Sequence, residues 1–157
     1  MSGEGRLTGA QWDALRLCFG CVRGRSCQLG LDDHPTADGI GGTVTFSERH
    51  AGGPSTVHGG FLAAVLDEIS GKVAMAAGVI AVTKTLEVQF LKAAPVGVVL
   101  NVAAQRRRVE GRAWTIDSRI SSADGHDLVT GTGLFITVPT PPEVTIRLAA
   151  SEGSSSG

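Results

Sequence analysis

The sequence predicts an α+β domain in which an antiparallel sheet of about five strands wraps around one long central helix. The helix is predicted over residues 61–77, where apolar residues recur at spacings of three and four: Leu62, Leu66, Ile69, Val73 and Ala76. After Gly78, four segments with the character of strands follow one another, at about 81–91, 96–109, 113–121 and 127–138.

A fifth strand is predicted before the helix. Within residues 40–46, Ile40, Val44 and Phe46 share one face and threonines share the other, which is the alternation of a strand. Glycine and proline in residues 51–55 then interrupt the pattern. Further along, Glu110-Gly111 and Asp124-Gly125 favour tight hairpin turns, because glycine tolerates positive φ. We therefore expect consecutive strands to pair antiparallel.

The segments that flank this pattern predict a three-part organisation. Residues 1–38 are expected to form an N-terminal arm, with a short helix from Thr8 to about Leu17 and an irregular stretch over residues 20–39. Residues 39–142 form the predicted domain. The small residues of the C-terminal tail, 143–157, predict partial disorder.

The composition excludes several classes of function. A chain of 157 residues suits a single core, and 14 basic against 15 acidic side chains give a net charge of -1. This balance predicts no nucleic-acid partner and no attraction to an anionic membrane. The N-terminus lacks the basic and apolar regions of a secretory signal, and no apolar run is long enough to span a bilayer, so a cytoplasmic location is expected.

The three cysteines lie close together in the predicted arm. Cys18, Cys21 and Cys27 are an odd number, which argues against a disulfide framework. Together with His34 they have the donor types of a Cys₃His zinc site, and reduced, partly buried thiols are the alternative interpretation. We adopt the second interpretation, and so expect neither a metal nor a cofactor.

The start of the predicted helix carries the first candidate site residues, in His58-Gly59-Gly60. The first backbone N–H groups of a helix have no partner within the helix, and glycine leaves them unshielded. Such donors, at the positive end of the helix dipole, can stabilise negative charge on a carbonyl oxygen during acyl transfer. A glycine pair that forms only a turn is the alternative.

Asp67 is the second candidate, because a carboxylate is costly to bury among the apolar neighbours of this helix. The neighbouring Glu68 faces elsewhere and precedes Lys72 by four residues, an order that favours a salt bridge. At about 1.5 Å per residue, Gly60 and Asp67 lie roughly 10 Å apart along one helix. One carbonyl cannot easily reach both, so we expect two copies related by a two-fold axis to share each site.

The segment around the start of the predicted helix also resembles a known family. The segment Val57-His-Gly-Gly-Phe-Leu-Ala-Ala-Val-Leu-Asp-Glu68, preceded by Gly52-Gly-Pro54, resembles the signature of the hotdog-fold acyl-CoA thioesterases, in their branch of small single-domain enzymes. Cys18-Phe-Gly-Cys21 with Leu29-Gly-Leu31 is similar to an N-terminal motif of many members. The resemblance covers about residues 18–138 and implies hydrolysis of an acyl-CoA by a homodimer or homotetramer.

The resemblance also implies roles for individual residues. The Gly60 amide would polarise the thioester carbonyl, Asp67 of the partner subunit would act as general base or nucleophile, and Thr83 would place the water. His58 would orient the loop or contact the thioester, unless it is structural. The family's asparagine before the His-Gly-Gly has no counterpart in residues 50–54 of this chain.

Strand alternation leaves the choice of threonine open. It places Thr83, Thr85 and Glu87 on one face, opposite the face of Val82, Leu86, Val88 and Phe90. Thr85 is therefore a rival to Thr83, and a structural threonine is a further alternative.

Arginines flank the predicted Glu110-Gly111 turn and are candidates for the phosphates of coenzyme A: Arg106, Arg107, Arg108 and Arg112. A solvated hairpin end explains the same run, and Lys92 is a weaker phosphate candidate. Two other functions stay open. One is an acyl-CoA-binding module without catalysis, and the other is a hotdog-fold hydratase with Asp124 and His126 as its acid-base pair.

Overall fold

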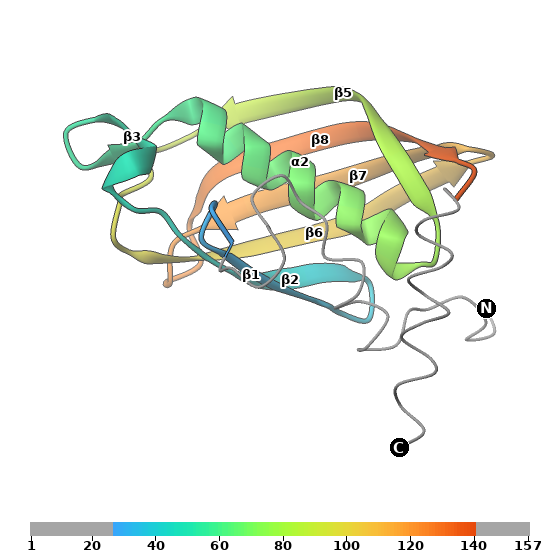
Figure 1. Ribbon diagram of the computed structural model, residues 1–157, viewed down its shortest axis with the longest axis horizontal. Helices are drawn as coiled ribbons and strands as arrows, with labels where there is room; N and C mark the ends of the chain where they lie inside the picture. The colour runs from blue at the N-terminus through green and yellow to red at the C-terminus, as the bar shows by residue number, and fades with distance from the viewer. Residues whose placement is uncertain (1–26, 141–157) are drawn as a thin grey trace, which may run out of the picture.

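The computed structural model describes residues 27–140, which form one main sheet, one long helix and a small two-stranded ribbon. The main sheet has six antiparallel strands, in the order β1 (Leu31–Pro35), β2 (Gly39–Thr45), β6 (Val99–Glu110), β7 (Ala113–Ser121), β8 (Asp127–Val138) and β5 (Ile80–Phe90). Helix α2 (Gly59–Ala76) crosses one face of this sheet (Figure 1). The predicted α+β class, with a sheet around one long helix, is confirmed.

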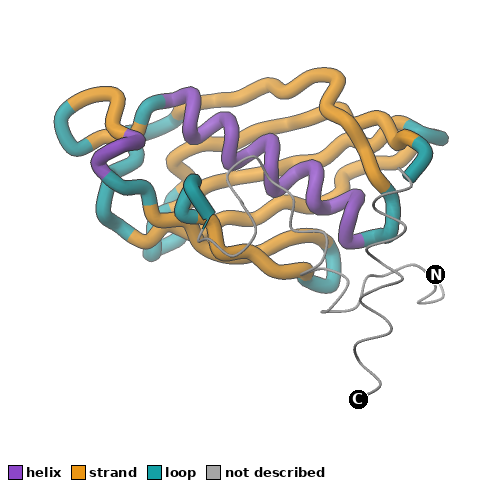
Figure 2. Tube along the Cα trace, viewed as in Figure 1, coloured by secondary structure: helices purple, strands orange, loops and turns teal. Residues whose placement is uncertain are grey.

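Helix α2 forms where the apolar stripe predicts it. Its sheet-facing side buries Leu62, Leu66, Ile69 and Val73, each at most 4% exposed, against the inner faces of the strands. The chain leaves the helix at Gly78, whose φ of +83° favours glycine. Figure 2 shows the helix running the length of the sheet, so that its start and its end lie over opposite ends of the strands.

Strand β1 corrects one expectation. Residues 20–39 were expected to be irregular and the sheet to hold about five strands; residues 31–35 instead form a sixth strand, paired with β2. The sequence pattern conceals it because the inward positions are Leu31 and Asp33, and a buried carboxylate breaks the apolar alternation. Strand β1 thus lies within the range assigned to the N-terminal arm.

The pairing of strands corrects a second expectation. The turns at Gly111 and Gly125 join antiparallel neighbours as predicted, with φ of +58° and +88°. However, β5 and β6 follow each other in the chain without pairing, since β5 pairs with β8 and β6 pairs with β2 and β7. Strand β5 is therefore an edge of the sheet, and its outer backbone groups have no partner strand among the described residues.

A short ribbon introduces the helix. Strands β3 (Ala51–Gly53) and β4 (Thr56–Val57) pair across a turn in which Ser55 has a φ of 59°. This ribbon occupies the segment where the sequence predicts a break, and it delivers His58 to the start of α2. The ribbon is fixed to the body of the protein by the amide of Val57, which donates to the carbonyl of Ala94 at 2.9 Å.

Some expectations concern residues outside 27–140. The helix predicted over residues 8–17, Cys18, Cys21 and the tail 143–157 lie outside the described part of the chain. Within that part, no helix is both long and apolar enough to cross a membrane.

Candidate active site

The start of α2 is capped by the histidine that precedes it. The amide of Gly60 donates a 2.9 Å hydrogen bond to Nδ1 of His58, so that nitrogen accepts and carries no proton. The amides of Phe61 and Leu62 turn back to the carbonyl of His58. The amide of Gly59 has no acceptor within residues 27–140. Of the two backbone N–H donors expected at Gly59 and Gly60, the Gly59 amide is therefore open to a ligand, and the Gly60 amide is hydrogen-bonded to the imidazole of His58.

A second histidine, His50, fixes the loop ahead of the helix. Its Nδ1 accepts from the amide of Ser47 at 3.0 Å, so Nε2 carries the proton and donates to the carbonyl of Gln28 at 2.8 Å. Its own carbonyl accepts the amide of His58. His50 is only 4% exposed, and both ring nitrogens are occupied. It is a structural residue, and sequence reasoning missed it because the sequence alone shows no partner for its ring.

Asp67 and Thr83 are brought together by α2 and β5. The hydroxyl of Thr83 donates a 2.7 Å hydrogen bond to Oδ1 of Asp67. Thr83 pairs across the sheet with Phe135, whose side chain is buried under the helix, and residues paired in this way point to the same face. The structure therefore places Thr83, and not Thr85, beside the acid.

The reason is a bulge in β5. Thr83 pairs with Phe135 and Thr85 with Leu134, so Lys84 is an extra residue with no partner. The bulge shifts the alternation, and Thr85 points away from the helix while Thr83 points towards it. The expectation that both threonines share a face with Glu87 is wrong for this reason, because strict alternation holds only in a regular strand.

Glu68 faces a buried ion pair and not Asp67's side of the helix. Lys72 Nζ lies 2.8 Å from Asp33 Oδ1 on β1 and 3.6 Å from Glu68 Oε1. Burial raises the pKa of Glu68, and the positive charge of Lys72 opposes that rise. The predicted Glu68–Lys72 salt bridge is confirmed, and Asp33 is a member of the cluster that the sequence did not suggest.

The arginines lie far from the start of α2. Figure 1 shows the β6–β7 turn at the opposite end of the sheet from the start of α2. All four side chains have partners within the chain: Arg106 lies over the Trp114 ring, Arg107 pairs with Asp117, Arg108 with Glu110, and Arg112 donates to the Thr137 carbonyl. Lys92 is closer to the start of α2, because it lies two residues beyond Phe90, whose ring contacts Gly59.

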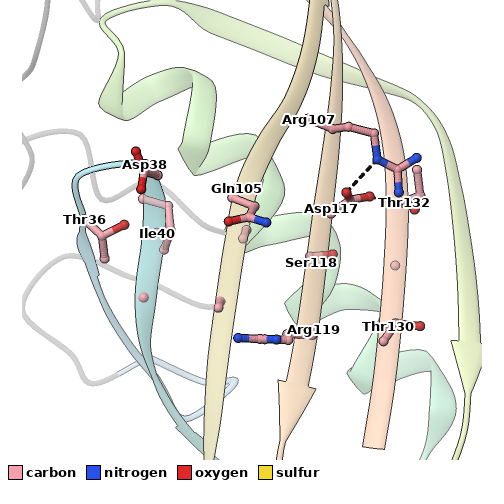
Figure 3. A pocket seen from close by; sticks show the side chains of 14 residues that line it. Thr36, Asp38, Ile40, Gln105, Arg107, Asp117, Ser118, Arg119, Thr130 and Thr132 are labelled. Carbon is pink, nitrogen blue, oxygen red and sulfur yellow. Dashed lines mark hydrogen bonds and ion pairs between the residues drawn. The ribbon is translucent and has the colours of Figure 1, made fainter. Parts of the chain in front are cut away.

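A hollow of about 490 Å³ lies on the sheet face opposite the helix (Figure 3). Arg107 lies at its rim, where its Nε donates to Asp117 at 2.7 Å, and Thr132 donates to the other oxygen of Asp117 at 3.0 Å. Neither Asp67 nor Thr83 borders this hollow. The candidate arginine therefore belongs to a different surface from the candidate acid.

Two further sets of candidates are placed by the structure. Asp124 and His126 form an exposed 3.0 Å pair in the β7–β8 turn, where hydrogen bonds from Ser122 and His126 lower the pKa of Asp124 to about 2. Of the zinc candidates, half-buried Cys27 and exposed His34 are described, and within residues 27–140 no three metal-binding side chains gather.

Known proteins are similar to this chain in both sequence and fold. Residues 55–129 match the thioesterase superfamily. The mouse acyl-coenzyme A thioesterase THEM4 is 37% identical over 86 residues, which are 54% of this chain and 37% of that protein. The rat protein of the same name is 35% identical over the same length. The chain thus spans little more than a third of the curated relatives that it matches.

Solved structures extend the comparison. A thioesterase superfamily protein is 30% identical with a TM-score of 0.65, over 68% of this chain and 55% of that one. A hypothetical thioesterase of Streptococcus pneumoniae, solved with coenzyme A, is 22% identical with a TM-score of 0.66, over 70% of this chain and 90% of that one. Two variants of the pneumococcal protein carry alanine for an aspartate and for a threonine sixteen residues further along.

These likenesses and the topology define the class of protein. An antiparallel sheet wrapped around one long helix, with close structural counterparts among thioesterases, is the hotdog fold. Within that class, the chain is similar to the thioesterase superfamily, whose family model matches residues 55–129.

Proposed function

We propose that this chain hydrolyses acyl-coenzyme A thioesters to a carboxylic acid and free coenzyme A. The observation that carries the proposal is the 2.7 Å hydrogen bond from Thr83 to Asp67, because it holds a carboxylate in one orientation. Asp67 and Thr83 are sixteen residues apart. The same spacing separates the aspartate and the threonine that were replaced in the pneumococcal thioesterase.

Asp67 is the proposed general base or nucleophile. Thr83 occupies Oδ1, which leaves Oδ2 to accept a proton from water or to attack the carbonyl carbon itself. In the first route the water oxygen bonds to the carbonyl carbon, the carbon–sulfur bond breaks, and the proton held by Asp67 passes to the departing thiolate. In the second route an Asp67 oxygen bonds to the carbonyl carbon and the carbon–sulfur bond breaks, which releases the coenzyme A thiolate and leaves an acyl-enzyme anhydride. Water then hydrolyses the anhydride to the free acid and regenerates Asp67, and the thiolate takes up the proton that this water releases.

The glycine pair supplies the proposed oxyanion donors. The Gly59 amide is open, and the Gly60 amide becomes available when the exposed His58 ring turns away. Turning the ring forfeits one hydrogen bond, with a net cost of about 1 kcal/mol. An oxyanion donor contributes about 3 kcal/mol to acyl transfer, so the exchange favours the bound transition state.

Each proposed site is shared by two copies of the chain. Along one helix, the donors at Gly59 and Gly60 lie roughly 10 Å from Asp67, because a helix rises about 1.5 Å per residue. Pairing of the open β5 edges around a two-fold axis would bring the helix start of one copy towards Asp67 of the other. We therefore propose a homodimer, and a tetramer would be two such dimers.

The phosphates of coenzyme A need basic side chains near this shared site. Lys92, close to Phe90 and Gly59, is the proposed contact from the copy that supplies the oxyanion donors. The β6–β7 turn lies at the far end of the sheet from the start of α2 (Figure 1). Its arginines could therefore contact coenzyme A only at the site whose oxyanion donors come from the partner copy. Salt bridges to Asp117 and Glu110 already engage Arg107 and Arg108, which makes Arg106 and Arg112 the better candidates there.

A thiol-release assay over a panel of acyl-CoAs tests the function. The wild-type protein should release coenzyme A, and Asp67→Asn should lose at least about a hundredfold in kcat, the scale of a general base. Glu87→Gln is the matched control, because Glu87 is an exposed carboxylate on the outer face of β5. Tight acyl-CoA binding without thiol release would replace hydrolysis by a binding function.

A further inference from the structure

Phe90, the last residue of β5, packs directly on Gly59. A methyl group placed on Gly59 would lie 3.3 Å from two carbons of the Phe90 ring, which is tighter than ordinary contact. The ring therefore lies against the glycine whose amide is open. Phe90 is also 56% exposed, so part of its side chain is available to a molecule that binds at Gly59.

Other rings gather at the same end of the helix. Phe61 contacts His58 and His50 edge to face, with ring centroids 6.3 Å and 4.8 Å apart. The buried ring of Phe46 contacts the other side of this group, with its centroid 5.6 Å from that of His50. The chain has only five phenylalanines and no tyrosine. Three of the five, Phe46, Phe61 and Phe90, thus lie near the start of α2.

We propose that Phe90 determines acyl specificity, by contacting the acyl group and favouring one with an aromatic ring close to the carbonyl. The proposal rests on the proposed hydrolysis, because it needs a thioester carbonyl at the Gly59 amide. A carbonyl oxygen accepts from an amide at about 2.9 Å, which places its carbon roughly 4 Å from the Gly59 nitrogen. The substituent on that carbon then falls within reach of the ring beside Gly59.

The chemistry of the ring selects the class of acyl group. A half-exposed phenyl face gains contact with any apolar substituent, and it gains additional attraction with another aromatic ring in an offset or edge-to-face arrangement. A charged acyl group, such as one that ends in a carboxylate, would lose hydration against this ring without a compensating partner. The structure thus predicts the order aromatic, then alkyl, then carboxylate-bearing acyl groups.

The experiment compares kcat/KM for phenylacetyl-CoA, hexanoyl-CoA and acetyl-CoA in the wild type, Phe90→Ala and Phe90→Leu. For Phe90→Ala we expect about a tenfold loss with phenylacetyl-CoA and a clearly smaller loss with acetyl-CoA, which ends in a methyl group. Phe90→Leu should recover the hexanoyl rate more fully than the phenylacetyl rate. Leu91→Ala is the matched control, because Leu91 is a neighbouring apolar residue with a similar exposure of 52%.

A second readout separates this proposal from hydrolysis itself. Analogues of phenylacetyl-CoA and hexanoyl-CoA in which a methylene group separates the sulfur from the carbonyl keep the carbonyl acceptor but cannot be hydrolysed, and their affinities can be measured by calorimetry for the same variants. A selective loss of phenylacetyl binding in Phe90→Ala supports the contact even if no thiol is released, in which case only the hydrolysis proposal fails. Equal losses for all acyl groups, or no loss at all, would overturn the role of Phe90.

Discussion

The hydroxyl of Thr83 donates to Oδ1 of Asp67 at 2.7 Å, and this bond joins the edge strand β5 to the middle of α2. It exists because the bulge at Lys84 turns Thr83 towards the helix. Without that extra residue, regular alternation would tie the direction of Thr83 to that of Thr85. The orientation of Asp67 therefore depends on the bulge in β5, because that bulge turns the hydroxyl of Thr83 towards the carboxylate.

Thr83→Val tests the positioning of Asp67. The variant keeps the shape of the side chain and removes the donor, so kcat should fall about tenfold to a hundredfold, the range for a hydrogen bond to a charged group. Thr83→Ser should retain most of the rate, because it keeps the hydroxyl. The control is Thr85→Val, which changes the outer face. If Thr85→Val slowed the reaction more than Thr83→Val, the assignment would be reversed.

His58→Ala tests the cap at the start of α2. The variant leaves the Gly60 amide without its acceptor, and loss of an N-cap costs about 1 kcal/mol of unfolding free energy. His58→Asn should restore most of this stability, because asparagine is a good N-cap. Chemical denaturation of the three proteins measures the difference. Equal destabilisation by alanine and asparagine would show that the cap contributes little.

Glu68 predicts a dependence of stability on pH. Burial raises the pKa of Glu68 above its ordinary 4.5, so between 4.5 and the raised value the folded state binds more protons than the unfolded state. The contribution of Glu68 to the free energy of unfolding is therefore largest in acid and falls as the pH rises through this window. We expect denaturation curves of the wild type and Glu68→Gln, measured from pH 4 to pH 7, to differ in this direction. A difference between the two proteins that stayed constant with pH would contradict the prediction.

Complementation tests the shared site. Asp67→Asn removes the acid, and Gly59→Val forces a side chain against the Phe90 ring, so each variant alone should be inactive. Co-expressed chains with different tags should form mixed dimers in which one of the two sites is intact. About a quarter of the wild-type activity is expected for random pairing around a two-fold axis. Activity no higher than that of the single variants would place each site within one chain.

The sequence by itself determined the long helix, the hairpin turns and the pairing of a glycine-rich helix start with an acid two turns later. These features follow from spacing along one element, which the rigid geometry of a helix or a tight turn translates directly into position. The distance between Gly60 and Asp67 also follows from spacing along one helix, and the expectation of a shared site depends on that distance. The Glu68–Lys72 bridge was predictable for the same reason.

Only the tertiary structure decided the matters that depend on contacts between distant segments. The bulge at Lys84 comes from the register between β5 and β8, and it selects Thr83 over Thr85. The exposed edge of β5 follows from its pairing with β8 in place of β6. The buried position of Asp33 in β1 is paired with Lys72, which lies 39 residues away along the chain. Phe90 meets Gly59 because the end of an edge strand returns to the start of the helix, a contact that no spacing within either segment encodes.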